Sequence, residues 1–209
     1  MKFTTVTIAY SAAAFVTASP CQPAPSSTPT SSIKDGDIFQ LDAVGAHGLI
    51  QNTYFQAYDR GLNLDGRQGA PCTNNAGLST SVNFAQFYLN NGTLFLSGRD
   101  QQAKKFFVDR SGMGQGVIQY TSGPANGRYF EISGWKTTPE GYLVFNGGGT
   151  AEDTSFQACP LNDGSFHIWL SAAGGEATNP AGNTDCFPIG AKINKITDES
   201  QYVVCQYSE

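Results

Sequence analysis

The side chains best suited to chemistry in this sequence are acids close to expected strands and turns. Four of them could supply the paired carboxylates that cleave glycosidic bonds: Asp42, Asp59, Glu131 and Asp163. Hydrolysis requires two carboxyl groups flanking one bond, and a sequence does not reveal which acids lie together. Acids at strand ends also commonly serve solubility, so glycoside hydrolysis is the least favoured function.

Nucleophilic and metal-dependent catalysis have few candidate residues. The chain has 2 histidines, His47 and His167, so a Ser-His-Asp triad would have to use one of them, and no GxSxG motif is present. A zinc site would need closely spaced thiolate or imidazole ligands, and the chain has no CxxC pair. We therefore expect no catalytic residue, no bound metal and no cofactor.

Aromatic side chains form the other candidate site, because exposed rings stack on sugar faces while amides bond the hydroxyl groups. Trp135, Tyr142 and Trp169 lie among Asn and Gly residues in a chain with few charges, and they are the candidate glycan-binding residues. The competing interpretation places both tryptophans in the core. Trp135 ends an expected strand, and Trp169 alternates with apolar neighbours in FHIWL. We favour the core for both.

Cysteine usage indicates an oxidising compartment. Four of the 5 cysteines lie in the expected folded body, which predicts two disulfides among Cys72, Cys159, Cys186 and Cys205. Three connectivities are open. We expect strand to join strand (Cys159 with Cys205) and loop to join loop (Cys72 with Cys186). Cys21 is left over. Three possibilities stay open for it: a free thiol, a link between two molecules, or a disulfide with a cysteine of the folded body.

These residues must be positioned almost entirely by β-strands. Short runs rich in aromatic and β-branched residues alternate with clusters of Gly, Pro, Asn and Asp, and no stretch has the periodicity of a long helix. The expected strands are residues 38–44, 53–58, 82–89, 93–97, 104–109, 117–121, 129–135, 142–146, 155–159, 166–171 and 191–196. Asn91-Gly92 predicts a type I′ hairpin turn, and Asn91 with Thr93 forms a glycosylation sequon.

The pattern predicts an all-β fold: a single antiparallel domain of about a dozen short strands, stabilised by disulfides and arranged as a β-sandwich or an irregular barrel. A faint internal repeat leaves a β-trefoil-like fold as the alternative. A turn, a short strand and an aromatic strand at residues 92–107 recur at residues 141–156. A third copy is not recognisable, so the three architectures stay open.

The most distinctive stretch is Lys104–Gly123, which reads KKFFVDRSGMGQGVIQYTSG. Gly112, Gly114 and Gly116 alternate in a reversal between two expected strands, where glycine permits positive φ or a close backbone approach. A phosphate-binding loop would need a helix after the glycines, whereas residues 117–120 are strand-like. The stretch therefore predicts a structural turn.

The residues before the glycines are suited to fixing this turn. We expect Asp109, Arg110 and Ser111 to do so through side-chain hydrogen bonds and an ion pair. The segment FFVDRSGMGQGVIQYTSG resembles the signature of a family of small secreted fungal proteins, the PhiA-like proteins, which is typified by a cell-wall protein of phialide development. Shorter similarities occur at residues 87–94, 134–135 and 158–160 and at the last two cysteines.

The resemblance implies a secreted, wall-associated and non-enzymatic fungal protein. Some members of the family are described as IgE-binding allergens or as elicitors of plant defence. No catalytic residue is assigned in the family, so none is transferred to this chain. The resemblance also implies a role in asexual development, in the formation of phialides and conidia, and in protection against stress.

The beginning of the chain is typical of an exported protein. Lys2, the apolar residues 3–15 and the small or β-branched residues 16–18 predict a signal peptide over residues 1–18. Residues 19–34 are rich in Pro, Ser and Thr and predict a flexible tail, and residues 35–209 predict one all-β domain. A hydrophobic tail for a glycolipid anchor is missing, so we expect a secreted protein of the extracellular space or cell wall.

The charge of the chain excludes two classes of partner. Charged residues make up 14% of the sequence, against about a quarter in a typical protein, and the net charge is −5. The only basic cluster is Lys104, Lys105 and Arg110. Nucleic acid and anionic membranes attract concentrated positive charge, so neither is an expected partner. We expect cell-wall polysaccharide or another wall component; the alternative is a lectin-, elicitor- or allergen-like protein that binds a glycan or a host protein.

Overall fold

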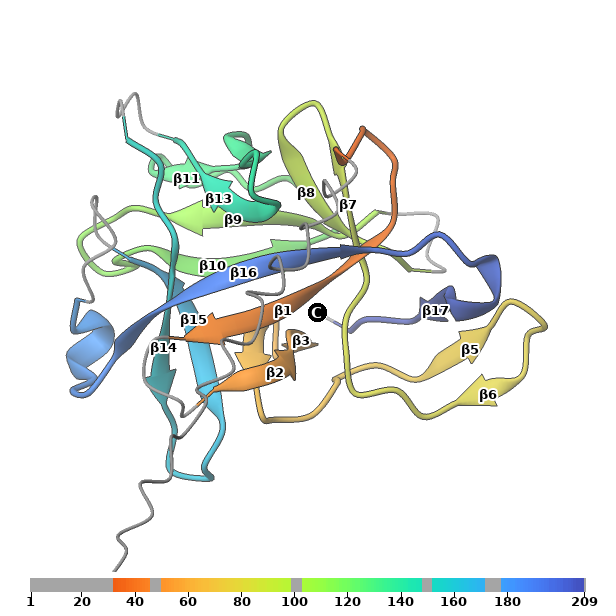
Figure 1. Cartoon of the computed structure of the whole chain (residues 1–209). Coiled ribbons are helices and arrows are strands. Elements are labelled where there is room, and N and C mark those ends of the chain that lie inside the picture. Colours follow the sequence, from red (N-terminus) through yellow and green to blue (C-terminus); the bar gives the residue numbers. More distant parts are fainter. Residues whose placement is uncertain (1–31, 46–49, 99–102, 148–151, 172–177, 209) are drawn as a thin grey trace, which may run out of the picture.

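The computed structural model describes residues 32–45, 50–98, 103–147, 152–171 and 178–208 (Figure 1). The expected signal peptide and most of the expected tail lie outside these residues, as do Cys21 and His47. The predictions made for those parts therefore stay predictions. In the described part of the chain, the helical turns are short, and none could cross a membrane.

Seventeen strands and two short 3-10 helices make up the described structure. The first nine strands are β1 (Phe39–Gly45), β2 (Gln51–Tyr54), β3 (Gln56–Tyr58), β4 (Gly61–Leu64), β5 (Cys72–Asn74), β6 (Ser79–Thr80), β7 (Phe87–Asn90), β8 (Thr93–Leu96) and β9 (Lys105–Asp109). The others are β10 (Val117–Thr121), β11 (Phe130–Glu131), β12 (Trp135–Thr137), β13 (Tyr142–Phe145), β14 (Phe156–Pro160), β15 (Phe166–Leu170), β16 (Phe187–Lys195) and β17 (Val203–Cys205). The helices are η2 (Pro180–Gly182) and η3 (Glu199–Gln201).

The main sheet closes on itself as an irregular barrel. Its strand pairings run from β1 through β16, β14, β15, β10, β9, β8 and β7 and return to β1. Strands β3 and β4 attach beside β15 and β10, whereas β12 and β13 attach to β16. Figure 1 shows β1 and β16 crossing the middle of the molecule side by side. The all-β, antiparallel prediction is confirmed, and the closed ring favours the irregular barrel among the expected architectures.

The barrel interior is filled by alternating side chains, because successive residues of a strand point to opposite faces. In β1, Phe39, Leu41 and Ala43 are buried, and the residues between them are more exposed. Large aromatic rings meet across the interior: the centres of Phe55 and Phe156 lie 5.7 Å apart in an edge-to-face contact. Such a core holds the surface loops in fixed relative positions.

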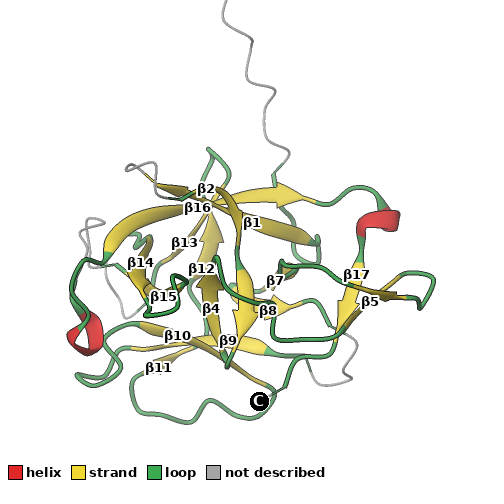
Figure 2. Ribbon diagram, turned by 90° about the horizontal axis from the view of Figure 1, so that it is seen from below, coloured by secondary structure: helices red, strands yellow, loops and turns green. Residues whose placement is uncertain are grey.

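A second, three-stranded sheet of β17, β5 and β6 lies to one side of the barrel (Figure 2). Cys72 and Cys205 stand directly opposite each other in its β5–β17 pair and form a disulfide. The second disulfide joins Cys159 on β14 to Cys186, which directly precedes β16. All four expected cysteines are therefore disulfide-bonded.

The expected pairing of these cysteines is wrong. Cys72 lies in a strand rather than a loop, and each disulfide links segments that the sheet pairing already holds side by side. The pairing follows cross-strand neighbours, which local sequence does not reveal. The same reason explains why β4 (GLNL) and β5 (CTN) were not expected: both lack the usual strand residues and are strands because their neighbours pair with them.

Candidate functional site

The signature turn, residues 109–116, connects β9 to β10 and binds mainly to itself. The Asp109 carboxylate accepts a hydrogen bond from the Ser111 amide at 2.8 Å, and the Ser111 hydroxyl accepts one from the Gly114 amide at 2.9 Å. The Gly116 amide donates to the Asp109 carbonyl at 2.7 Å, which closes the turn. These bonds confirm that Asp109 and Ser111 fix the turn.

Two of the three glycines in this turn are required by its geometry. A Cβ atom at Gly114 would lie 2.1 Å from Cγ of Asp109, which is closer than any real contact. Gly116 has a φ of +87°, in the region that favours glycine. Gly112 has open space around it. The alternating glycines are therefore not equivalent.

Arg110 points away from the turn rather than closing it. Its Nε lies 3.6 Å from Oε2 of Glu131 on β11, and its guanidinium carbon lies 5.6 Å from the centre of the Phe145 ring on β13. An ion pair therefore exists, but it links the turn to other strands instead of closing the turn, and neither Nε of Arg110 nor Oε2 of Glu131 makes a hydrogen bond within the described residues. Asp109 is not its partner, because that carboxylate is bound to Ser111 and packed against Gly114.

The tryptophans proposed for glycan binding lie in the interior. Trp135 is 2% exposed and its ring centre lies 4.8 Å from that of Phe145, whereas Trp169 is 8% exposed. Neither can offer a ring face to a sugar, so their assignment to glycan binding is wrong and the core interpretation is confirmed. Tyr142 is half-buried: its ring packs over Gly190, and the Lys192 ammonium lies 4.7 Å from its centre.

The four candidate carboxylates are distributed over separate elements. Asp42 lies on β1 and bonds the Asn194 side chain, and burial raises the pKa of its carboxyl group. Glu131 is paired with Arg110, and Asp59 lies in the turn between β3 and β4. Among the described residues, no hydrogen bond joins any two of these acids or Asp163. These contacts assign no pair of the kind that glycoside hydrolysis would use.

His167 is the described histidine, and it packs against the backbone of β4. A Cβ atom at Gly61 would lie 2.7 Å from its Cε1. Burial lowers the pKa of its imidazole, and the nearby charge of Asp59 partly offsets this effect. Its Nε2 is buried without a hydrogen-bond partner in the described structure. Within the same residues, no group of three His, Cys, Asp or Glu side chains could hold a metal ion.

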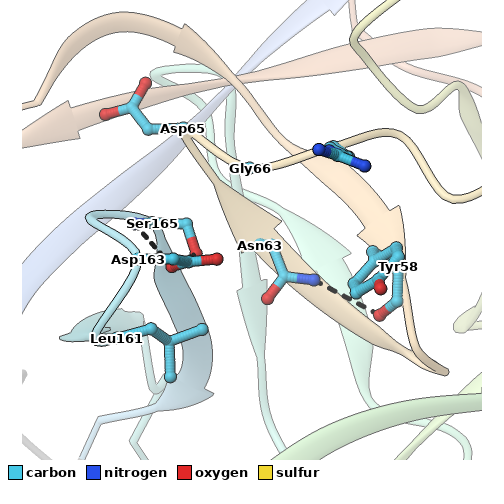
Figure 3. A pocket seen from close by; sticks show the side chains of 8 residues that line it. Tyr58, Asn63, Asp65, Gly66, Leu161, Asp163 and Ser165 are labelled. Carbon is cyan, nitrogen blue, oxygen red and sulfur yellow. Dashed lines mark hydrogen bonds between the residues drawn. The ribbon is translucent and has the colours of Figure 1, made fainter.

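A polar depression of about 470 Å³ lies between the end of β4 and the turn from β14 to β15 (Figure 3). We call it the β4 depression. Its lining combines one aromatic, one aliphatic and several polar side chains: Tyr58, Asn63, Asp65, Gly66, Arg67, Leu161, Asp163 and Ser165. Of the four candidate carboxylates, only Asp163 lines this depression. A ring, an amide and two carboxylates on one concave surface are groups that can bind a sugar.

Tyr58 provides the aromatic surface of the β4 depression. The ring is held from behind, because a Cβ atom at Gly69 would lie 2.9 Å from its Cδ2. The side chain nevertheless remains 50% exposed. It is therefore a fixed, accessible aromatic side chain.

Amide side chains hold the loop that forms one wall of the depression. Gln56 accepts a hydrogen bond from the Gly66 amide at 3.2 Å, and Asn83 donates to the Gly66 carbonyl at 3.3 Å. Gln68 accepts from the Ala57 amide at 2.9 Å. These bonds tie the loop to β3 and to the segment around Asn83, so the wall is positioned before any ligand arrives.

The charged side chains of the depression differ in how many hydrogen bonds they make within the protein. The Oδ1 atom of Asp163 accepts hydrogen bonds from the Ser165 amide at 3.0 Å and the Ser165 hydroxyl at 2.6 Å. These bonds and the charge of Arg67 lower the pKa of the Asp163 carboxyl group. Asp65 has a φ of +55° directly after β4 and makes no hydrogen bond or ion pair within the described structure.

Comparison with known proteins decides the family. Residues 39–208 match the model of the family described as "PhiA-like secreted protein". The chain belongs to this family. The match confirms the resemblance inferred from the signature segment and the expected secretion.

Relatives of this family member are similar along most or all of its length. The protein named "Cell wall protein phiA" from Emericella nidulans is 35% identical over 211 residues, which cover all of both chains. Its namesake from Aspergillus fumigatus is 34% identical over 99% of this chain and all of the relative. That of Arthroderma benhamiae is 31% identical over 81% of this chain and 87% of the relative. No solved structure matches the chain significantly.

The sequon of this PhiA-like chain lies at a tight turn, as expected. Asn91 and Gly92 have φ values of +47° and +71°, and Asn90 pairs with Thr93 across the β7–β8 hairpin. Positive φ at both central residues is the mark of a type I′ turn. Asn91 is exposed. Its glycosylation stays a prediction.

Sequence reasoning missed most of the β4 depression in this chain. Tyr58, Asn63 and Asp65 follow one another closely around β4, which was not expected to be a strand. The opposite wall comes from a turn about a hundred residues later, and only the pairing of β4 with β15 brings the two together. One signal was available: the Asn-Leu-Asp-Gly run at residues 63–66, which is typical of a turn.

Proposed function

We propose that this chain is a structural, non-enzymatic protein of the fungal cell wall that is retained there by polysaccharide bound in the β4 depression. The observation that carries the proposal is Tyr58, a half-exposed ring fixed beside Asn63 and two carboxylates. An aromatic face supplies stacking area, and the acceptors around it suit sugar hydroxyl groups. The wall location is supported by relatives that are named cell wall proteins.

The non-enzymatic part of the proposal is supported by the surroundings of the acids. Glycosidases use one carboxyl group with a raised pKa as the acid and a second, ionised group across the bond. In the β4 depression, the pKa of Asp163 is lowered, which suits a permanent charge rather than a proton donor. Asp42, whose pKa is raised, lies on β1 and does not line the depression.

The finer biological role follows from the family. We propose that wall retention serves asexual development, in the formation of phialides and conidia, and protects the wall against stress. A compact barrel with two disulfides and few charges is suited to a passive role in an exposed layer. Loss of the protein should reduce conidium number and raise sensitivity to wall-perturbing dyes; normal conidiation and dye resistance would contradict the role.

Sedimentation with washed cell walls tests the retention. The purified protein should sediment with the walls and resist washing, and no reducing sugar should appear in the supernatant over a long incubation. A protein that stays in solution would remove the wall-binding mechanism. Release of reducing sugar would require an enzymatic function instead.

A further inference from the structure

The lining of the β4 depression carries more negative than positive charge. Asp65 and Asp163 contribute two negative charges to its lining, and Arg67 contributes one positive charge. We propose that the depression binds a protonated amino sugar, so that the polysaccharide retaining this protein is a glucosamine polymer, that is, deacetylated chitin. The inference rests on the proposed function and names the ligand class of the same site.

Both carboxylates are available to a ligand. Ser165 occupies Oδ1 of Asp163, whereas Oδ2 of Asp163 has no hydrogen-bond partner in the described structure. Asp65 has no partner there either. Arg67 acts on Asp163 only through longer-range attraction, because no ion pair joins them within the described residues. An ammonium group bound in the depression would offset negative charge that the protein leaves unpaired.

Asn63 provides a second and independent indication of a ligand. The side chain is 4% exposed, and its Nδ2 donates to the Tyr58 carbonyl at 3.2 Å. Its amide oxygen has no partner among the described residues and turns away from that bond, within the lining of the depression (Figure 3). This oxygen is not fully enclosed by the protein, so it is open to an incoming donor from the depression.

The open groups of the site are thus mainly acceptors. Asp65, Asp163 and Asn63 all present oxygens. An ammonium group carries three hydrogen-bond donors and a positive charge, whereas a sugar hydroxyl carries one donor and no charge. Tyr58 adds a ring face that attracts both sugar carbon–hydrogen surfaces and cations. Acetylation of the amino group would remove the charge and two of the donors, so the acetylated polymer should fit less well.

Binding of matched oligosaccharides by calorimetry tests the inference. The probes are β-linked oligomers of equal length built from glucosamine, from N-acetylglucosamine and from glucose. The glucosamine oligomer should bind about tenfold more tightly than the other two. Asp65→Asn should abolish this preference, and the fold should tolerate it because Asn also adopts positive φ readily. Tyr58→Ala should weaken binding of all three oligomers.

A charge-matched control separates site binding from general attraction. Asp185→Asn removes one exposed acid outside the depression, also at a positive φ (+67°), and should keep the preference. An equal loss in this control would overturn the inference. Equal binding of the glucose oligomer by the wild-type protein would overturn the inference but leave wall retention standing. No binding to any oligomer or to washed walls would overturn both.

Discussion

The signature turn and the β4 depression are both loops on the same barrel, but their polar groups are used in opposite ways. In the turn, Asp109 and Ser111 bond backbone amides of the turn itself, and Gly114 lets the chain close over them. In the depression, Asp65 has no partner among the described residues, and Tyr58 is half exposed. The Asp109 and Ser111 side chains are thus used within the turn, whereas the Asp65 side chain in the depression is left to solvent or a ligand.

Under the proposed function, the most distinctive stretch of the sequence is not the binding site. The signature turn carried the resemblance to the family in the sequence. Its residues are explained by closure of the β9–β10 hairpin and by the Arg110–Glu131 link. The depression is built from ordinary residues that three strands bring together. The account is tested by perturbing the framework, the turn and the depression separately, from the largest expected effect to the smallest.

The largest effects should come from the disulfides, which belong to the framework. Replacing Cys72 and Cys205 by serine opens a cross-link with a sequence separation of 133 residues and should lower the free energy of unfolding by about 5 kcal/mol. Replacing Cys159 and Cys186, separated by 27 residues, should lower it by about 3.5 kcal/mol. Urea unfolding measures both, and a larger loss from the shorter cross-link would contradict the loop-entropy argument.

Trp135→Ala should be nearly as damaging, because it leaves a cavity beside Phe145 and Phe156 in the core. We expect a loss of about 4 kcal/mol in urea unfolding. The fraction that remains folded should still sediment with walls as the wild type does. A stable variant that no longer binds walls would restore Trp135 to the binding surface.

Gly114→Ala should disrupt the signature turn. The new methyl group would displace the Asp109 carboxylate and break its bond to Ser111, which should cost about 2 to 3 kcal/mol in chemical unfolding. Gly112→Ala is the matched control and should change stability by less than about 0.5 kcal/mol, because the position is open. Similar losses from both substitutions would show that the turn does not need its particular geometry.

Acid should weaken the framework through Asp37. Its hydrogen bond to Lys195, at 2.6 Å, lowers the pKa of the Asp37 carboxyl group. The stabilisation is therefore complete above the unfolded-state pKa of about 3.9 and is lost as the pH falls through the lower folded-state pKa. Lys195→Met should remove up to about 1 kcal/mol at pH 7 and flatten the stability profile between about pH 5 and 2. An unchanged profile in the variant would contradict this linkage.

The sequence revealed the framework better than the site, for a physical reason. Strands such as β1 and β9 are rich in aromatic or apolar residues. They can be recognised from their own sequence, because alternation and β-propensity do not depend on the neighbouring strands. β4 was missed because its strand state depends on β3, β15 and β10, which pair with it from elsewhere in the chain. The disulfide pairing and the β4 depression depend on the same long-range pairing, so they could not be predicted before the topology was known.

Wall sedimentation of Tyr58→Ala and Tyr129→Ala tests the central claim most directly. Both tyrosines are 50% exposed, but Tyr58 lines the β4 depression and Tyr129 lies beside the signature turn, where its carbonyl accepts the Arg110 amide. The account predicts that Tyr58→Ala lowers retention on washed walls about tenfold, as expected for a stacking contact of about 1.4 kcal/mol, and that Tyr129→Ala leaves it unchanged. Equal retention of the two variants, or a loss confined to Tyr129→Ala, would contradict it.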